Sequence, residues 1–87
     1  MTVEPAMTIG VLLFAAAREA AGTARVELTL PPATTAGGAL AAVVAQYPAL
    51  AGLAPSLRLA VNSEYAAEGR PLAPGDELAL IPPTCGG

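Results

Sequence analysis

The sequence predicts an α+β fold in which one main helix packs across a small mixed sheet. Two observations lead to this prediction. Apolar residues follow the order strand, strand, helix, strand, short strand, strand along the chain. The single long helical segment has only one apolar face, so it must bury that face against a sheet. A length of 87 residues allows one modest core, in which roughly 60–65% of the unfolded chain's surface is buried.

The first part of the chain contains two predicted strands joined by a helical turn. Residues 8–15 are apolar and branched, as expected of a buried strand. The Ala-rich segment after them ends at Gly22, a typical residue for a helix C-terminus. Residues 23–30 alternate between polar and apolar types, which predicts a half-buried strand that pairs with the first as a hairpin.

The main helix is predicted to begin at Ala36, capped by Thr34 or Thr35, and to end at Pro48. Its large apolar residues recur at i, i+3, i+4 and i+7 and therefore share one face. These residues are Leu40, Val43, Val44 and Tyr47.

The last part of the chain contains the remaining strands. Residues 57–62 form the third strand, Asn62-Ser63 suits a tight turn, and residues 64–66 are at most a short edge strand. Residues 77–81 form the final strand after the turn at Pro74-Gly75-Asp76, in which Asp76 and Glu77 are interpreted as turn formers.

This order of elements is that of the β-grasp fold. We predict a β-grasp domain over residues 8–82, a flexible leader over residues 1–7, in which Met7 is an alternative start, and an extended tail over residues 83–87.

Composition excludes several classes of function. A net charge of −3 gives no counterion-release advantage, so nucleic acid is not an expected partner. The apolar run over residues 9–17 is too short to span a bilayer, and we expect a cytoplasmic protein with no membrane association. The chain has no histidine and one cysteine, which excludes a zinc site, a histidine-based triad and an internal disulfide. No bound cofactor or metal is expected.

The final segment, Ile-Pro-Pro-Thr-Cys-Gly-Gly, is the most informative one. Its prolines resist helix and favour an extended stalk, and six residues from Pro82 reach roughly 20 Å. Gly86 and Gly87 lack a β-carbon, so they can thread a narrow channel and present the terminal carboxylate to a remote site. Adenylation by ATP would activate that carboxylate, and a sulfur nucleophile would then yield a thiocarboxylate. The alternative is a frayed terminus without function.

Three segments resemble the small subunits of molybdopterin synthase, which are sulfur carriers of the ubiquitin-like β-grasp family. The first is an F-A-x-x-R-E-x-x-G opening that begins at Phe14 and includes Arg18 and Glu19. The second is the Val61-Asn62 pair in the third strand. The third is the ending over residues 72–87, which follows the pattern L-x-x-G-D-E, then P-P-x-x-G-G.

The resemblance implies that a thiocarboxylate on Gly87 donates sulfur to cyclic pyranopterin monophosphate during molybdenum cofactor biosynthesis. It implies two partners, an ATP-dependent adenylating enzyme and the large synthase subunit, which would carry the acid–base residues in a heterotetramer. The residues expected to contact these partners are Phe14, Tyr65, Ile81, Pro82, Pro83, Thr84 and Cys85. ATP would serve the activating enzyme alone.

Strand alternation leads to part of the same patch independently. It places Leu78 and Leu80 on the helix side of the final strand and leaves Ile81 on the open side, where Phe14 and Tyr65 would join it. The alternative is that Phe14 and Ile81 belong to the core.

Other functions remain open at this level. Cys85 departs from the small residue usual at its position and is interpreted as a tolerated side chain, or else as a thiol near the tail. Arg18-Glu19 is either a docking contact or a solvated ion pair. A sulfur carrier for thiamine, cysteine or another thio-metabolite, a ubiquitin-like protein modifier, and a plain interaction module are the alternative functions.

Overall fold

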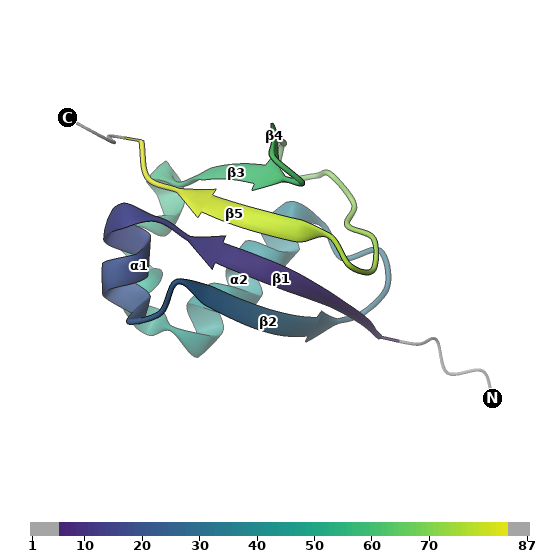
Figure 1. Ribbon diagram of the computed structural model, residues 1–87, viewed down its shortest axis with the longest axis horizontal. Helices are drawn as coiled ribbons and strands as arrows, with labels where there is room; N and C mark the ends of the chain where they lie inside the picture. The colour runs from purple at the N-terminus through teal and green to yellow at the C-terminus, as the bar shows by residue number, and fades with distance from the viewer. Residues whose placement is uncertain (1–5, 84–87) are drawn as a thin grey trace.

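A mixed sheet crossed by one long helix forms the structure, a computed structural model that describes residues 6–83 (Figure 1). Within these residues the sheet has five strands in the order β2-β1-β5-β3-β4. The strands are β1 (Met7–Leu13), β2 (Arg25–Leu30), β3 (Arg58–Val61), β4 (Glu64–Tyr65) and β5 (Glu77–Ile81). The helices are α1 (Ala15–Ala21) and α2 (Ala36–Gln46), followed by the 3₁₀ turns η1 (Pro48–Leu50) and η2 (Ala54–Ser56).

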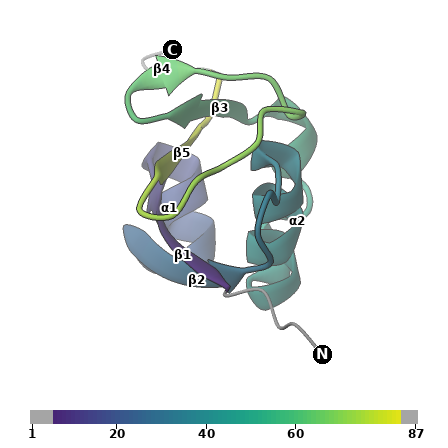
Figure 2. The ribbon, with the colours of Figure 1, turned by 90° about the vertical axis from the view of Figure 1, so that its right-hand side faces the viewer.

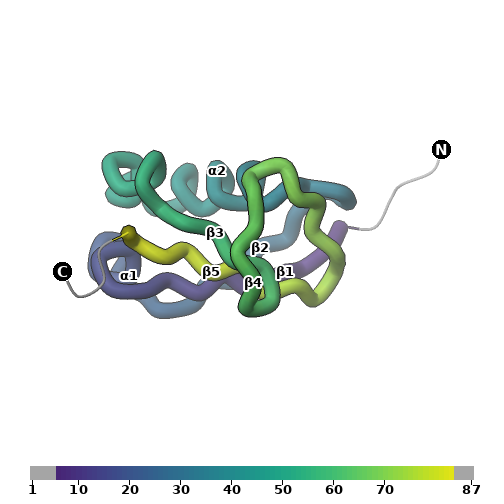
Figure 3. Tube along the Cα trace, turned by 90° about the horizontal axis from the view of Figure 1, so that it is seen from above, coloured from purple at the N-terminus to yellow at the C-terminus, as the bar shows by residue number. Residues whose placement is uncertain are grey.

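The central pair of strands is parallel and all other pairs are antiparallel. Both β1 and β5 therefore run toward the same end of the sheet, where their last residues lie beside α1 (Figure 1). Helix α2 lies along one face of the sheet, as Figures 2 and 3 show from two directions. This arrangement confirms the predicted α+β fold. In residues 6–83, no helix has the length and apolar character needed to span a membrane.

The core lies between α2 and the sheet face that it covers. The predicted alternation of β5 is confirmed: Leu78 and Leu80 are fully buried, whereas Ala79 and Ile81 lie on the other face and are partly exposed. The inward residues of β1 and β2 are buried in the same way. On α2, Leu40 and Val43 are buried as predicted and Val44 is half-buried, as is Tyr47, the C-cap residue that follows the helix.

Several boundaries differ from the prediction. Strand β1 begins at Met7, which is paired with Leu30 and only 3% exposed, so the folded domain includes a residue that we assigned to the leader. The strand ends at Leu13 because the chain turns sharply there. Phe14 is the extended N-cap of α1, and Ala15 has a positive φ of 48°. Strand β3 is shorter than predicted because Asn62 belongs to the following turn.

The N-terminus of α2 is capped partly by its own sequence and partly by a remote loop. The Thr35 hydroxyl accepts a hydrogen bond from the Gly38 N–H, as predicted. The carbonyls of Glu68 and Arg70 accept from the Gly37 and Ala36 N–H groups, both at 2.8 Å. This loop can approach so closely because Gly37 has no side chain: a β-carbon there would lie 2.9 Å from Glu68 Cβ.

Replacement of Gly37 by alanine should therefore destabilise the protein. In an ordinary helix the same change is stabilising by up to about 1 kcal/mol. Here the added methyl would lie 2.9 Å from Glu68 Cβ and 3.2 Å from the Glu68 carbonyl oxygen, and overpacking of this kind costs about 1–3 kcal/mol. Thermal unfolding of Gly37→Ala should show a lower Tm. Gly52→Ala, where nothing lies within 4 Å of the new methyl, is the control, and equal effects of both changes would contradict this account.

Candidate functional site

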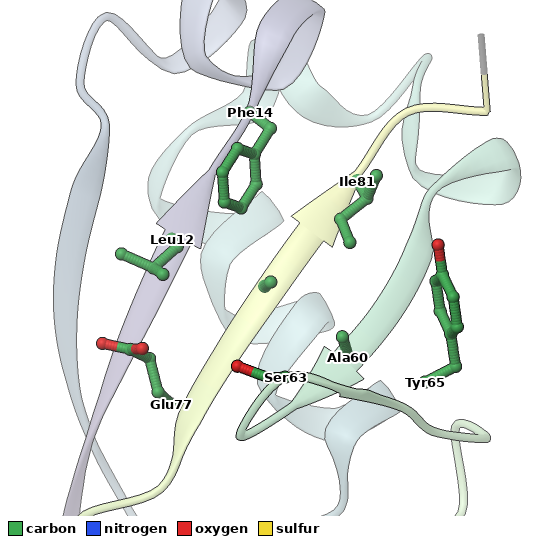
Figure 4. Close-up of a pocket in the computed structure, with 8 residues that line it drawn as sticks. Leu12, Phe14, Ala60, Ser63, Tyr65, Glu77 and Ile81 are labelled. Atoms are coloured by element: carbon green, nitrogen blue, oxygen red, sulfur yellow. The ribbon is translucent and has the colours of Figure 1, made fainter. Parts of the chain in front are cut away.

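A hollow of about 260 Å³ lies on the face of the sheet opposite α2 (Figure 4). We call it the open-face hollow. Residues from β1, β3, β4, β5 and their ends line it: Leu12, Phe14, Ala60, Ser63, Tyr65, Glu77, Ala79 and Ile81. The structure thus brings together Phe14, Tyr65 and Ile81, which the sequence predicted to share an open face.

The hollow exists because small residues form its floor and large ones its walls. Ala60 and Ala79 are directly opposite each other on β3 and β5, so only two methyl groups fill the centre. Phe14 stands at the end of β1 and Tyr65 on β4, and these side chains are 45% and 69% exposed. Ile81 is the last residue of β5 and is half-buried. Exposed apolar side chains gathered around a depression usually mark an interaction site.

Glu77, one of the residues that line the open-face hollow, forms an ion pair with Arg25. Arg25 Nη1 on β2 lies 2.9 Å from Glu77 Oε2 on β5, and both side chains are about half exposed, 50% and 47%. The arginine crosses β1 above Gly10, where a β-carbon would lie 2.6 Å from Arg25 Nη2. An exposed pair of this kind contributes little to stability, about 0–1 kcal/mol. Glu77 is the first residue of β5, as the predicted bounds of the final strand have it, and it lines the hollow rather than forming the turn.

Asn62 holds the β3–β4 turn against the start of β5. Asn62 and Ser63 both have positive φ, 51° and 72°, in the tight turn that the sequence predicted. Asn62 Nδ2 donates to Asp76 Oδ1 at 3.0 Å, and the Glu77 N–H donates to Asn62 Oδ1 at 3.0 Å. Because β4 follows this turn directly, these bonds fix the strand that carries Tyr65 relative to β5.

Asp76 is a turn former, as predicted. Its Oδ2 accepts a hydrogen bond of 2.8 Å from the Ala73 N–H. This backbone bond, then the bond from Asn62, and lastly the charge of Arg70 hold the pKa of Asp76 below its usual value, against a small opposing effect of burial. The family-like Val-Asn and Gly-Asp-Glu motifs therefore include residues that position the site rather than react in it.

The remaining predicted site residues lie beside the hollow or outside the described residues. Pro82 is buried and Pro83 exposed, so the chain leaves the body of the domain after Pro82. Thr84, Cys85, Gly86 and Gly87 lie outside the described residues. Arg18 and Glu19 are exposed on α1, and within residues 6–83 the ion pair found is the one between Arg25 and Glu77. No group of three or more potential metal ligands occurs in the same part of the chain.

The fold is that of a ubiquitin-like β-grasp protein, with the open-face hollow at the end of the sheet where β1 and β5 end. Residues 11–87 match the model of the ThiS family, and the chain belongs to this family.

Three known proteins show how close the likeness is. The chain is 39% identical over 79 residues to the molybdopterin synthase sulfur carrier subunit of Arabidopsis thaliana, covering 91% of this chain and 82% of that protein. The crystal structure of small archaeal modifier protein 1 from Haloferax volcanii has a TM-score of 0.83 and 36% identity, covering 90% and 99% of the two chains. A chain in the complex of subunits 1 and 2 of molybdopterin-converting factor from Helicobacter pylori shares the fold, with a TM-score of 0.66, 23% identity and coverage of 93% and 100%.

The lowered pKa of Asp76 predicts how stability depends on pH. A carboxyl whose pKa is lower in the folded state is stabilising above its unfolded pKa, and this contribution is lost as pH falls through the folded pKa. Asp76→Asn should therefore lower the Tm at pH 7, and the difference from the wild type should shrink once the pH falls below the usual range of an aspartate. Thermal melts of both proteins at pH 7 and pH 3 measure this, and a difference independent of pH would contradict the assignment.

Proposed function

We propose that this chain is the sulfur carrier and small subunit of a molybdopterin synthase. The observation that carries the proposal is the 39% identity, over most of both chains, to a protein named for that role. The open-face hollow supports it, because a carrier with no catalytic side chains must be recognised by the enzymes that act on its tail. The charge of −3 favours partners whose surface around the docking site is basic.

The chemistry proposed for the tail uses the carboxylate of Gly87. In an activating enzyme this carboxylate attacks the α-phosphorus of ATP, pyrophosphate leaves, and the acyl adenylate forms. Sulfur from a persulfide then displaces AMP, and a thiol reduces the resulting acyl disulfide to the thiocarboxylate. In the large subunit the thiocarboxylate donates its sulfur to cyclic pyranopterin monophosphate. The acid–base groups for these steps belong to the two partners.

The open-face hollow is the proposed docking site for the large subunit. It lies where β5 ends, so a partner that receives the tail also covers Phe14 and Ile81. Burial of these side chains releases water from apolar surface, and Glu77 adds no unpaired charge because Arg25 neutralises it. The position of the hollow thus couples recognition of the domain to capture of the tail.

The test of the carrier function is intact-mass analysis after incubation with the activating enzyme, ATP and a persulfide donor. We expect a product heavier by the exchange of one oxygen for one sulfur, located at Gly87 by fragmentation. Deletion of Gly87, or addition of one residue after it, should abolish loading and leave the Tm nearly unchanged. If the full chain stays a carboxylate under these conditions, the proposed function is wrong.

The docking site is tested by introducing a charge into the hollow. Ile81→Lys should weaken binding to the large subunit by about 30-fold or more, which corresponds to about 2 kcal/mol for an interface anchor. Thr29→Lys adds the same charge to an exposed position of β2 on the same sheet face, outside the hollow, and is the matched control. Calorimetric titration measures both affinities, and thermal melts verify folding. Unfolding of Ile81→Lys would assign Ile81 to the core, and equal affinities of the two variants would exclude the hollow as the interface.

A second function is supported by the likeness to small archaeal modifier protein 1. Protein conjugation would start from the same adenylate, with a lysine amine in place of the sulfur nucleophile. The two functions are separated in native-host extracts by tryptic peptides in which a lysine carries residues 59–87 of this chain, since trypsin cleaves after Arg58 and not between Arg70 and Pro71. Such peptides would establish conjugation, and their absence beside a loaded thiocarboxylate would leave the carrier function alone.

A further inference from the structure

The outer edge of β3 is only half covered by its neighbour. Strand β4 pairs with Ala60 and Val61, whereas Arg58 and Leu59 extend beyond it. The chain does not continue along this edge because the carbonyls of Glu68 and Arg70 are bonded to the N-terminus of α2. Capping of the helix thus draws the chain away from the sheet after Ala66.

A second hollow, of about 330 Å³, lies at the uncovered edge. We call it the edge hollow. Its walls come from residues 57–59 of the third-strand segment and from residues 65–68. The guanidinium of Arg58 lies over the Tyr65 ring, 6.0 Å from its centroid. Tyr65 lines both hollows, so the edge hollow is continuous with the proposed docking face.

The backbone of β3 determines what can pair with this edge. In a strand, the N–H and C=O of one residue point toward the neighbour on one side, and those of the next residue point toward the other side. Asn62 N–H donates to the Glu77 carbonyl on β5, so Leu57 and Leu59 direct their groups outward. The Leu59 carbonyl accepts from the Ala66 N–H at 2.9 Å, and the Leu57 N–H donates to the Ala54 carbonyl at 3.2 Å. Among the hydrogen bonds between residues 6–83, the backbone groups left at this edge are therefore the Leu57 C=O and the Leu59 N–H.

These two groups match one residue of a parallel strand. In a parallel ladder, a residue of one strand donates its N–H to the carbonyl of the residue that precedes its partner on the other strand. Its own carbonyl accepts a hydrogen bond from the N–H of the residue that follows that partner. An antiparallel pair would instead need both groups of Leu59, and its carbonyl is already bonded. We propose that the large subunit adds an extended segment to this edge, running parallel to β3, with one residue opposite Arg58. This inference rests on the proposed function.

The position of the edge explains why the tail's recipient is the proposed occupant. Arg58 is directly opposite Ile81, the last residue of β5, so the uncovered edge adjoins the point from which the tail departs. A partner that covers the open-face hollow and takes up the tail already contacts Tyr65. Addition of a strand there satisfies backbone groups and buries the exposed tyrosine ring, the usual energetic basis of recognition at a sheet edge.

The experiment follows the Leu59 amide by hydrogen exchange in isotope-labelled chain, free and saturated with the unlabelled large subunit. Binding should slow exchange at Leu59 by more than about tenfold, as expected of a newly bonded amide. The Ala60 amide, which faces β5, serves as the internal reference and should change much less. Ala67→Trp, which fills the edge hollow, should weaken binding more than about tenfold. Ala51→Trp, at an exposed position on a different part of the chain, should not weaken it.

Each other outcome overturns the inference in a distinguishable way. Binding of the wild type without protection of Leu59 would exclude strand addition and leave the proposed function intact. Protection of Leu59 already in the free chain, lost on deletion of residues 84–87, would assign the edge to the chain's own tail. No binding of the wild type would remove both the proposed function and this inference.

Discussion

The parallel pairing of β1 with β5 is the interaction on which the rest of the structure depends. It joins the first and last strands of the chain at the centre of the sheet, with Val11 beside Leu78 and Leu13 beside Leu80. These four side chains are the middle of the core beneath α2. Because both strands run in the same direction, Phe14 and Ile81 come to the same end of the sheet, although 66 residues lie between them in the sequence.

Strand β5 therefore has two roles that do not compete. Its even-numbered residues, Leu78 and Leu80, are fully buried and hold the strand in register. Its odd-numbered residues face the open side, where Glu77, Ala79 and Ile81 form part of the hollow. A two-residue period allows one five-residue segment to serve stability on one face and the proposed docking on the other. Strand β5 is paired on both sides, with β1 and with β3.

Features with a short sequence period could be predicted from the sequence, and features that depend on remote pairing could not. Alternation in β5 placed Ile81 on the open side. The glycine after the first helix marked Gly22 as its cap, and the two threonines before the second narrowed its N-cap to Thr34 or Thr35, of which Thr35 is the one used. The ion pair of Arg25 with Glu77 joins residues 52 positions apart across Gly10, and nothing local to any of these residues indicates it.

The partial coverage of β3 was also beyond prediction. A two-residue strand gives almost no periodic signal, and its length is set by the bonds that draw residues 68–70 to the N-terminus of α2. The role of Asn62 had a weak signal, because Asn-Ser suits a tight turn. Its bonds to Asp76 and to the Glu77 amide depend on strand order, which periodicity alone does not determine.

The capping of α2 by a remote loop has a consequence for how this surface could diversify. The caps are backbone carbonyls of Glu68 and Arg70, so these two hydrogen bonds do not depend on which side chains the residues carry. Related chains could change the charge beside the edge hollow by substitution at position 68 without changing the shape of the edge. Gly37, in contrast, is constrained by the close approach of the Glu68 Cβ and carbonyl oxygen. Selection for new partners could thus change the side chain at position 68, while selection for folding keeps glycine at position 37.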